Sequence, residues 1–236
     1  MPLGRRRNRI DRSLRERGVP PEPQYRERDE LATDGPWDEA DAPEDGLERV
    51  DLGSLRIPAV PGMELRLEVG PQQQIGGATL VLGDSTLAVA AFAAPRAGGT
   101  WDDVRAELAR TGSGPGGSLT EIEGPFGPEL AGVVTAMAQD ATQGGTPTQV
   151  KLPARFLGVD GPRWFLRGTV LGPAGAGGDA ARAVEDAFRG IVVVRGNDPM
   201  PVREPLPLTL PPQAAQQLAG DDGDPGPGTR DAPRNL

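Results

Sequence analysis

The chain has 236 residues, a formal net charge of -9, no histidine, no cysteine and a single lysine, Lys151. This composition excludes thiol and imidazole catalysis, a disulfide framework and a zinc site built from Cys or His. The negative charge also disfavours general attraction to nucleic acid or anionic lipid. We therefore expect no cofactor, and only hard cations with oxygen ligands, such as Mg²⁺, remain as metal chemistry.

The apolar stretches of the chain are short. The longest, Leu87–Ala94, has the length of a strand and not the ~20 residues of a membrane span. No apolar segment follows the N-terminal arginines, so no secretory signal is visible. We expect a soluble cytoplasmic protein with no membrane partner.

Both ends of the chain have the composition of disordered segments. Residues 1–46 are predicted to form a charged arm, basic and then acidic, without a sustained apolar face. Residues 201–236 are rich in Pro and Gly, and the alternating Leu206, Leu208 and Leu210 predict an extended run along the domain surface. The basic part of the arm consists of Arg5, Arg6, Arg7, Arg9, Arg12, Arg15 and Arg17.

Residues 47–200 are predicted to form one domain made mostly of strands. Alternating polarity and tight-turn residues predict strands over 63–69, 75–82, 86–94, 119–123, 129–137, 149–159, 164–171 and 191–194. The strand over 86–94 is apolar on both faces, which predicts a central position. Pro153 predicts an edge or broken strand over 149–159, because proline lacks the N–H that a sheet needs.

Two helices are predicted beside these strands. Thr100 is a good N-cap, and Gly112 is suited to end that helix. The second helix is predicted to begin after Asp179 and to end at Gly190. The sequence therefore predicts an α+β fold: a mainly antiparallel twisted sheet with two principal helices packed on it.

A hairpin carries the main candidate contact residues. By alternation along its second strand, Trp164 faces the core, and Arg163, Phe165 and Arg167 face the other way. The face that we predict as a platform for a base, a phosphate or an acidic partner comprises Arg155, Arg163, Phe165 and Arg167. The alternative is internal pairing of these arginines with Glu64 and Glu68.

Trp37 is an isolated aromatic residue in the acidic part of the arm. Such a residue is typical of a docking motif for a partner protein. Packing of Trp37 back on the domain is the equal alternative.

Other motifs favour structural interpretations. The glycine-rich loop 172–178 leads into a helix but lacks a phosphate-loop signature, so we expect a flexible connector. Glu121 and Glu123 share a strand face, which predicts a solvated surface more than an acid–base pair.

Several unusual strings occur along the chain: GPWD at 35–38, VDLGSLRIP at 50–58, EGPFGPEL at 123–130, ARFLGVDGPRWFLRG at 154–168 and VVVRG at 192–196. In this order they resemble an uncharacterised actinobacterial family with a conserved domain of unknown function. The resemblance implies an actinobacterial source and a cytoplasmic location, and it brings no activity, cofactor or catalytic residue. The element order is also similar to the Mog1/PsbP-like sandwich, a fold used mostly for binding.

The leading hypothesis is a non-enzymatic binding or adaptor module that recruits a protein partner through Trp37 and the hairpin residues. One alternative is a nucleic-acid or nucleotide-associated accessory protein that uses the basic arm. The other is a Mg²⁺-dependent hydrolase built on carboxylates, which the sequence disfavours because its carboxylates are typical of helix caps and wet strand faces.

Overall fold

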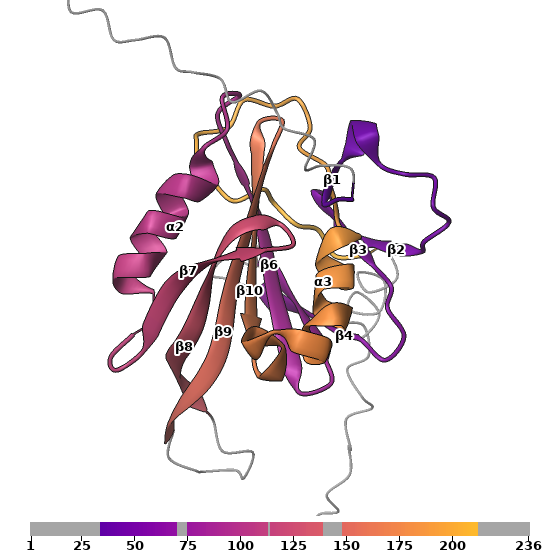
Figure 1. The fold of residues 1–236 in the computed structure, drawn as a ribbon. Helices are drawn as coiled ribbons and strands as arrows, with labels where there is room; N and C mark the ends of the chain where they lie inside the picture. The colour runs from indigo at the N-terminus through magenta and orange to yellow at the C-terminus, as the bar shows by residue number, and fades with distance from the viewer. Residues whose placement is uncertain (1–33, 70–74, 113, 139–147, 212–236) are drawn as a thin grey trace, which may run out of the picture. The chain divides into compact units, whose positions relative to one another are not determined.

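The computed structural model describes residues 34–69, 75–112, 114–138 and 148–211. It confirms the predicted α+β class, with two helices beside large, mainly antiparallel sheets (Figure 1). The boundaries predicted for the arm, the domain and the tail stay predictions, because residues 1–33 and 212–236 lie outside the described residues.

Seven strands form the large sheet, in the order β4-β5-β6-β10-β9-β8-β7. Every neighbouring pair in it is antiparallel. Its strands are β4 (Glu64–Val69), β5 (Ile75–Leu82), β6 (Ser85–Ala93), β7 (Ser118–Gly124), β8 (Gly127–Ala138), β9 (Thr148–Gly161) and β10 (Trp164–Leu171).

Four short strands from distant parts of the chain form a second sheet. Its order is β1 (Trp37–Asp38), β11 (Val192–Val193), β3 (Leu55–Pro58) and β2 (Arg49–Asp51). β1 runs parallel to β11, and the other pairs are antiparallel. A 3-10 helix, η2 (Glu39–Asp41), follows β1, so residues that the sequence assigns to the charged arm hold secondary structure here.

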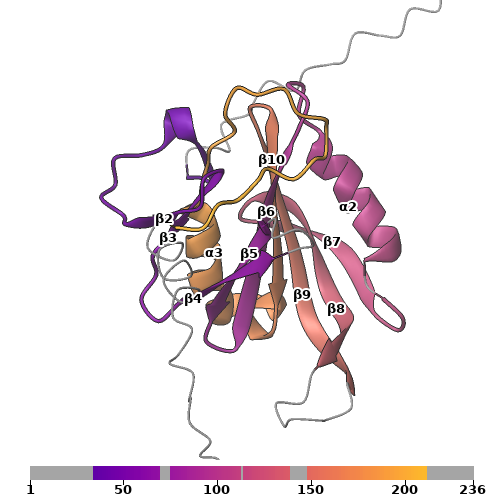
Figure 2. The same cartoon turned by 180° about the vertical axis from the view of Figure 1, so that it is seen from behind.

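The two faces of the large sheet have separate hydrophobic cores. Helix α3 (Arg182–Arg189) and strand β3 pack on one face, where Phe188, Leu55 and Leu166 are fully buried. Helix α2 (Thr100–Thr111) packs on the other face, where Trp101 and Phe165 are buried. Figures 1 and 2 show the two helices on either side of the sheet. β6 is an interior strand of the sheet, between β5 and β10, in agreement with the central position that its apolar pattern predicted.

Pro153 lies in an interior strand, so the predicted edge position of this strand is wrong. β9 runs unbroken between β8 and β10. β10 ends at Leu171, opposite Ala154, so β9 has no strand partner on that side at Pro153. The Pro153 carbonyl accepts a hydrogen bond from Gly172 N there, at 3.1 Å. Because the N and C=O of a strand residue point the same way, the missing N–H removes no ladder hydrogen bond.

The start of α2 differs from its prediction. Gly99, with φ 84°, is the N-cap, and Thr100 is the first helical residue. Asp160, from the β9–β10 hairpin, supplies the capping oxygen: its Oδ2 accepts from Gly99 N at 3.0 Å and Trp101 N at 3.2 Å. A side chain 59 residues away therefore holds the helix against the hairpin.

This cap has a measurable pH dependence. Burial raises the pKa of Asp160 above its ordinary value, against the lowering effect of the backbone N–H groups that it accepts. A carboxyl whose pKa is raised by folding loses stability as pH rises from its unfolded to its folded pKa. We expect Asp160→Asn, which keeps an acceptor but does not ionise, to gain stability relative to the wild type between pH ~4 and ~7.

Urea unfolding of both proteins at the two pH values measures this effect. Asp160→Ala is the control, and it should be less stable than Asp160→Asn by about 0.5–2 kcal/mol at both pH values, because it removes the cap and neither variant ionises at this position. The prediction would be contradicted if the difference in the free energy of unfolding between Asp160→Asn and the wild type stays constant with pH.

The second helix also begins later than predicted. Asp179 lies in a 3-10 helix, η5 (Gly178–Ala181), and α3 begins at Arg182 after Ala181. Asp179 forms an exposed ion pair with Arg182 at 2.9 Å instead of a cap. Loop 172–178 is folded as well, because η4 (Pro173–Ala176) buries Ala174 and Gly175.

The proline-rich run after residue 200 lies on the domain up to residue 211. Leu206 and Leu208 are buried. Leu206 N donates to Ala91 O at 2.8 Å, and Thr209 N donates to Leu52 O at 2.9 Å. The run thereby connects the small sheet to the large one.

Candidate binding groove

The five candidate residues fall in separate places. Trp37 lies in the small sheet, and Arg155 lies on the α3 face of the large sheet. Arg163 lies at the β9–β10 turn with φ 63°. Phe165 and Arg167 lie together on the α2 face, where they line a groove.

The backbone of Trp37 packs on the domain. Its N–H donates to Ile191 O at 2.9 Å, and its side chain is half-buried. The next residue, Asp38, accepts a hydrogen bond from the core Trp164 Nε1 at 2.7 Å. Trp37 therefore packs on the domain, which was one of the two alternatives for this residue. Its role in docking a partner stays a prediction.

Arg155 forms buried ion pairs. Its Nη2 lies 2.8 Å from Glu129 Oε2, and its Nη1 lies 2.7 Å from Glu185 Oε1 on α3. Only 6% of its side chain is exposed. Register explains the location, because Arg155 pairs with Val170 across the hairpin and shares the core face of that residue. Arg155 therefore does not share a surface with Phe165 and Arg167.

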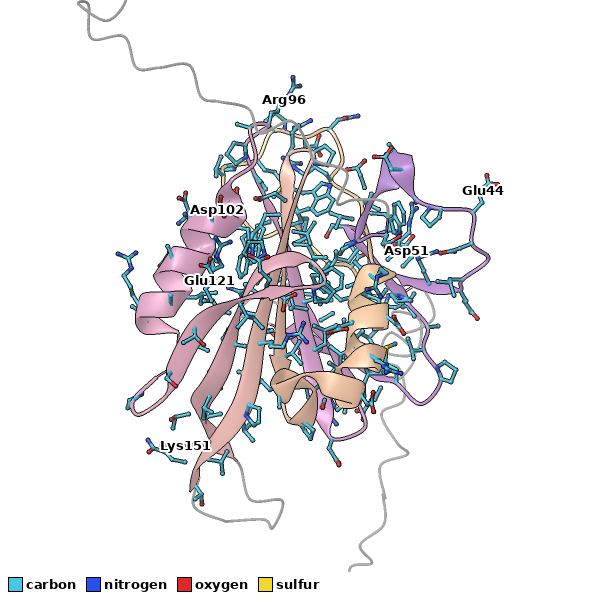
Figure 3. The ribbon with its side chains drawn as sticks, viewed as in Figure 1. Glu44, Asp51, Arg96, Asp102, Glu121 and Lys151 are labelled. Carbon is cyan, nitrogen blue, oxygen red and sulfur yellow. The ribbon has the colours of Figure 1, made fainter. Side chains whose placement is uncertain are left out.

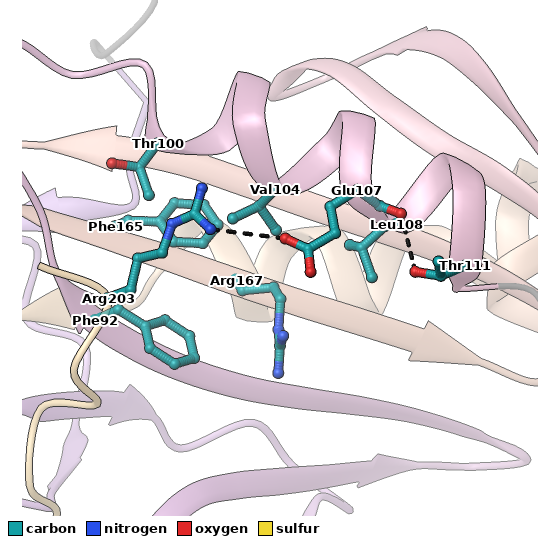
Figure 4. A pocket seen from close by; sticks show the side chains of 9 residues that line it. All are labelled: Phe92, Thr100, Val104, Glu107, Leu108, Thr111, Phe165, Arg167 and Arg203. Atoms are coloured by element: carbon teal, nitrogen blue, oxygen red, sulfur yellow. Dashed lines mark hydrogen bonds and ion pairs between the residues drawn. The ribbon is translucent and has the colours of Figure 1, made fainter.

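The groove lies between α2 and strands β6 and β10, and Figure 4 shows its lining. Val104 and Leu108 of α2 form one wall, and Phe92 and Phe165 form the floor. The cavity has a volume of about 220 Å³. Its lining comprises Phe92, Thr100, Val104, Glu107, Leu108, Thr111, Phe165, Arg167 and Arg203.

Stacked aromatic rings set the floor of the groove. Phe165 stacks on Phe92, with ring centroids 6.0 Å apart, and on Trp101, with centroids 5.9 Å apart. Trp101 lies directly over Gly158 of β9, where a Cβ would overlap its ring. Glycine at this position therefore lets α2 approach the sheet closely at its N-terminal end.

Arg167 is the unpaired cation of the groove. Its guanidinium lies 5.3 Å from the Phe92 ring centroid, in a cation–π contact. Within the described ranges it makes no hydrogen bond or ion pair. Burial lowers the pKa of Arg167 below its ordinary value, and the charge of Glu68 opposes this shift. A half-buried guanidinium with free donors is suited to bind an anionic group.

Arg203 closes one side of the groove from the proline-rich run. It has a positive φ of 69°, and its backbone N donates to Ala93 O at 2.8 Å. Its guanidinium lies 3.4 Å from Asp103 and 3.6 Å from Glu107, both on α2. Figure 4 shows Arg203 turned toward Glu107, whereas the Arg167 guanidinium turns away from Glu107. The sequence carries no periodic signal for this contact, which spans about a hundred residues of chain.

Residues 35–217 match the model of the family described as "Protein of unknown function (DUF3710)". The chain belongs to this family. The match confirms the resemblance to an uncharacterised family, and it gives the DUF3710 domain neither an activity nor a partner.

A crystal structure of a protein from Bacteroides thetaiotaomicron aligns with 71% of this chain at 14% identity and a TM-score of 0.38. The chain spans 54% of that protein. No curated protein matches the DUF3710 chain. The predicted likeness to the Mog1/PsbP-like sandwich is not confirmed.

The carboxylates of the DUF3710 domain that the sequence singled out lie at its surface. Glu121 and Glu123 are exposed. Figure 3 labels Asp102 on α2 and Glu121 on β7, and both pair with Arg105, at 3.0 and 2.9 Å. Among the described residues, no three acidic side chains gather where they would hold a metal ion.

Two further candidate features can be located. In loop 172–178 the Ala174 N–H donates to Ser85 Oγ at 2.9 Å, so this donor is used within the fold and is not available to a ligand. The basic arm, with its predicted nucleic-acid role, lies outside the described residues. No helix in the described part of the DUF3710 chain has the length and apolarity to cross a membrane.

Proposed function

We propose that this protein is a non-enzymatic binding module that recognises a partner protein through the groove between α2 and strands β6 and β10. Arg167 is the principal contact, and Phe92, Val104 and Leu108 supply apolar surface. The single observation that supports this most is the half-buried Arg167, which has no carboxylate partner within the described ranges.

Charge pairing of three other arginines, two of them near the groove, contrasts with the state of Arg167. Arg155 is neutralised by two carboxylates, Arg105 by two and Arg203 by two. A fold that pairs these arginines with acidic side chains leaves the one beside the aromatic floor without such a partner. An incoming acidic group would supply the missing partner and recover the cost of burying the charge.

No reaction is assigned to the groove. Of its titratable side chains, Glu107 and Arg203 form an ion pair, and Arg167 has no base beside it to accept a proton. Aromatic and arginine side chains that surround an apolar hollow are typical of recognition sites in protein interfaces.

Partner capture with matched variants tests this proposal. The full chain, Arg167→Met and Arg182→Met serve as baits in cell extract of the source organism, and mass spectrometry quantifies the captured proteins. Arg182 is the matched control because it is 78% exposed, pairs only with Asp179 and lies on α3, outside the groove lining. We expect at least one partner to fall about tenfold or more with Arg167→Met and to persist with Arg182→Met.

Circular dichroism of both variants checks that the fold is retained. Identical partner profiles for the wild type and Arg167→Met would remove the groove as the recognition site.

A further inference from the structure

Small residues isolate Arg167 on its face of the sheet. In the antiparallel register its cross-strand neighbours are Ala90 on β6 and Gly158 on β9. Neither neighbour has a side chain that can accept a hydrogen bond or cover the guanidinium. A guanidinium offers five N–H donors in a fixed fork, which a carboxylate engages two at a time.

The acidic residue nearest in register is already engaged. Glu68 lies opposite Gly77, further along the same row of the sheet. It accepts a hydrogen bond from Thr79 Oγ1 at 2.9 Å and forms no ion pair with Arg167. Its negative charge acts on Arg167 at a distance and raises the pKa of that guanidinium, against the effect of burial. The donors of Arg167 therefore have no hydrogen-bond acceptor or ion-pair partner among the described residues.

The size of the groove favours side chains over a whole cofactor. Its volume of about 220 Å³ is below the roughly 300–1,000 Å³ of pockets that enclose drug-sized ligands. Phe92, Val104 and Leu108 are each only partly buried, so apolar surface remains open beside the cation. This space suits one or two side chains of a partner segment.

The charges at the rim favour a single negative charge in the occupant. Glu107 lines the groove, and Asp103 lies beside it on α2. These two carboxylates share one cation, Arg203, so the rim keeps a net negative charge. A polyphosphate or nucleic acid would be repelled there, whereas one carboxylate placed on Arg167 would be attracted.

We infer that the groove takes a segment of the partner protein in which one Asp or Glu stands next to a bulky apolar residue. The carboxylate pairs with Arg167, and the apolar side chain lies against Phe92, Val104 and Leu108. This inference rests on the proposed function and names the chemistry of the partner.

Three defined probes test the inference on the full chain. They are the peptide acetyl-Ser-Leu-Glu-Leu-Ser-amide, the same peptide with Gln in place of Glu, and ATP. Binding is followed by chemical-shift perturbation for the wild type, Arg167→Met and the control Arg182→Met. The wild type and Arg182→Met should each bind the Glu peptide about tenfold or more tightly than the Gln peptide. Arg167→Met should bind the two peptides with equal affinity.

Three results would overturn the inference: equal affinity for the Glu and Gln peptides, no binding of the Glu peptide up to millimolar concentration, or tighter binding of ATP than of the Glu peptide. They would leave the proposed function intact if partner capture still depends on Arg167. Conversely, if the Glu peptide binds as expected but partner capture does not depend on Arg167, the proposed function is wrong and the preference of the groove for a carboxylate stands.

Discussion

Replacement of Arg155 by methionine is expected to lower the free energy of unfolding by about 3–5 kcal/mol. Arg155 donates to Glu129 Oε2 from both Nε and Nη2, at 3.0 and 2.8 Å, and to Glu185 from Nη1. Glu129 is completely buried, so removal of the guanidinium leaves a carboxylate with no compensating charge. Breaking one side of a buried ion pair costs much more than the pair itself contributes.

The environment of Glu129 sets the sign of the pH dependence. Gly124 leaves room for its carboxyl group, and its Oε1 is buried without a hydrogen bond to any described residue. Burial raises the pKa of Glu129 above its ordinary value even beside Arg155. Without Arg155 this pKa rises further, so the mutant loses stability as pH rises from the unfolded pKa through the folded one. The loss should be smaller at pH ~5 than at pH ~7.5.

Urea unfolding of Arg155→Met at both pH values measures the cost. The double variant Arg155→Met with Glu129→Gln should recover part of it, because no buried charge then lacks a partner. Glu185→Gln is the milder control, since the Glu185 side chain is 22% exposed. A cost below about 1 kcal/mol for Arg155→Met at neutral pH would show that this cluster is not a structural centre.

The position of Arg155 could be worked out from the sequence, but its partners could not. Counting outward from the turn at Pro162 and Arg163 pairs Arg155 with Val170, which lies on the core face. Grouping Arg155 with Phe165 and Arg167 ignored that register. Glu129 lies on the next strand, 26 residues away, and which carboxylate meets a buried arginine depends on strand order. Local periodicity carries no information on strand order.

Local patterns predicted the elements well because their causes are local. Strand β5 was predicted with its observed bounds, and α2 ends before Gly112 as predicted but starts one residue earlier than predicted. The predictions for caps failed where the capping group came from elsewhere, as Asp160 does for α2. The small sheet could not be predicted, because it pairs Trp37 with Val192, which are far apart in the sequence.

The candidate site shows the same division. Alternation along β10 correctly separated Trp164 from Phe165 and Arg167, so two residues of the groove were found from the sequence. Phe92 and Leu108 were read only as parts of a strand and a helix. Arg203 belongs to the groove through long-range contacts with Ala93 and Asp103, which proline-rich composition does not indicate.

Removal of the Trp101 side chain is expected to detach α2 from the sheet and to lower the free energy of unfolding by about 3–5 kcal/mol. Trp101 is 5% exposed, stacks on Phe165 and lies over Gly158. Its Nε1 donates to Pro128 O at 2.6 Å. Trp101→Ala therefore loses the aromatic contact, leaves a cavity and removes a buried hydrogen bond together.

Two matched variants separate these contributions in urea unfolding. Trp101→Phe keeps an aromatic ring over Gly158 and should lose only about 1–3 kcal/mol, because it leaves the Pro128 carbonyl without its donor. Leu108→Ala truncates a partly buried residue of the same helix and should cost less than Trp101→Ala.

The same variant connects stability to recognition. Val104 and Leu108 form the groove wall, and Trp101 on the same helix packs against Gly158 of β9. Trp101→Ala should therefore bind the Glu peptide more weakly than the wild type even where the domain stays folded, whereas Trp101→Phe should keep the affinity of the wild type. Full peptide affinity in a folded Trp101→Ala protein would mean that α2 is no part of the site, and that recognition rests on Arg167 and the open face of the sheet alone.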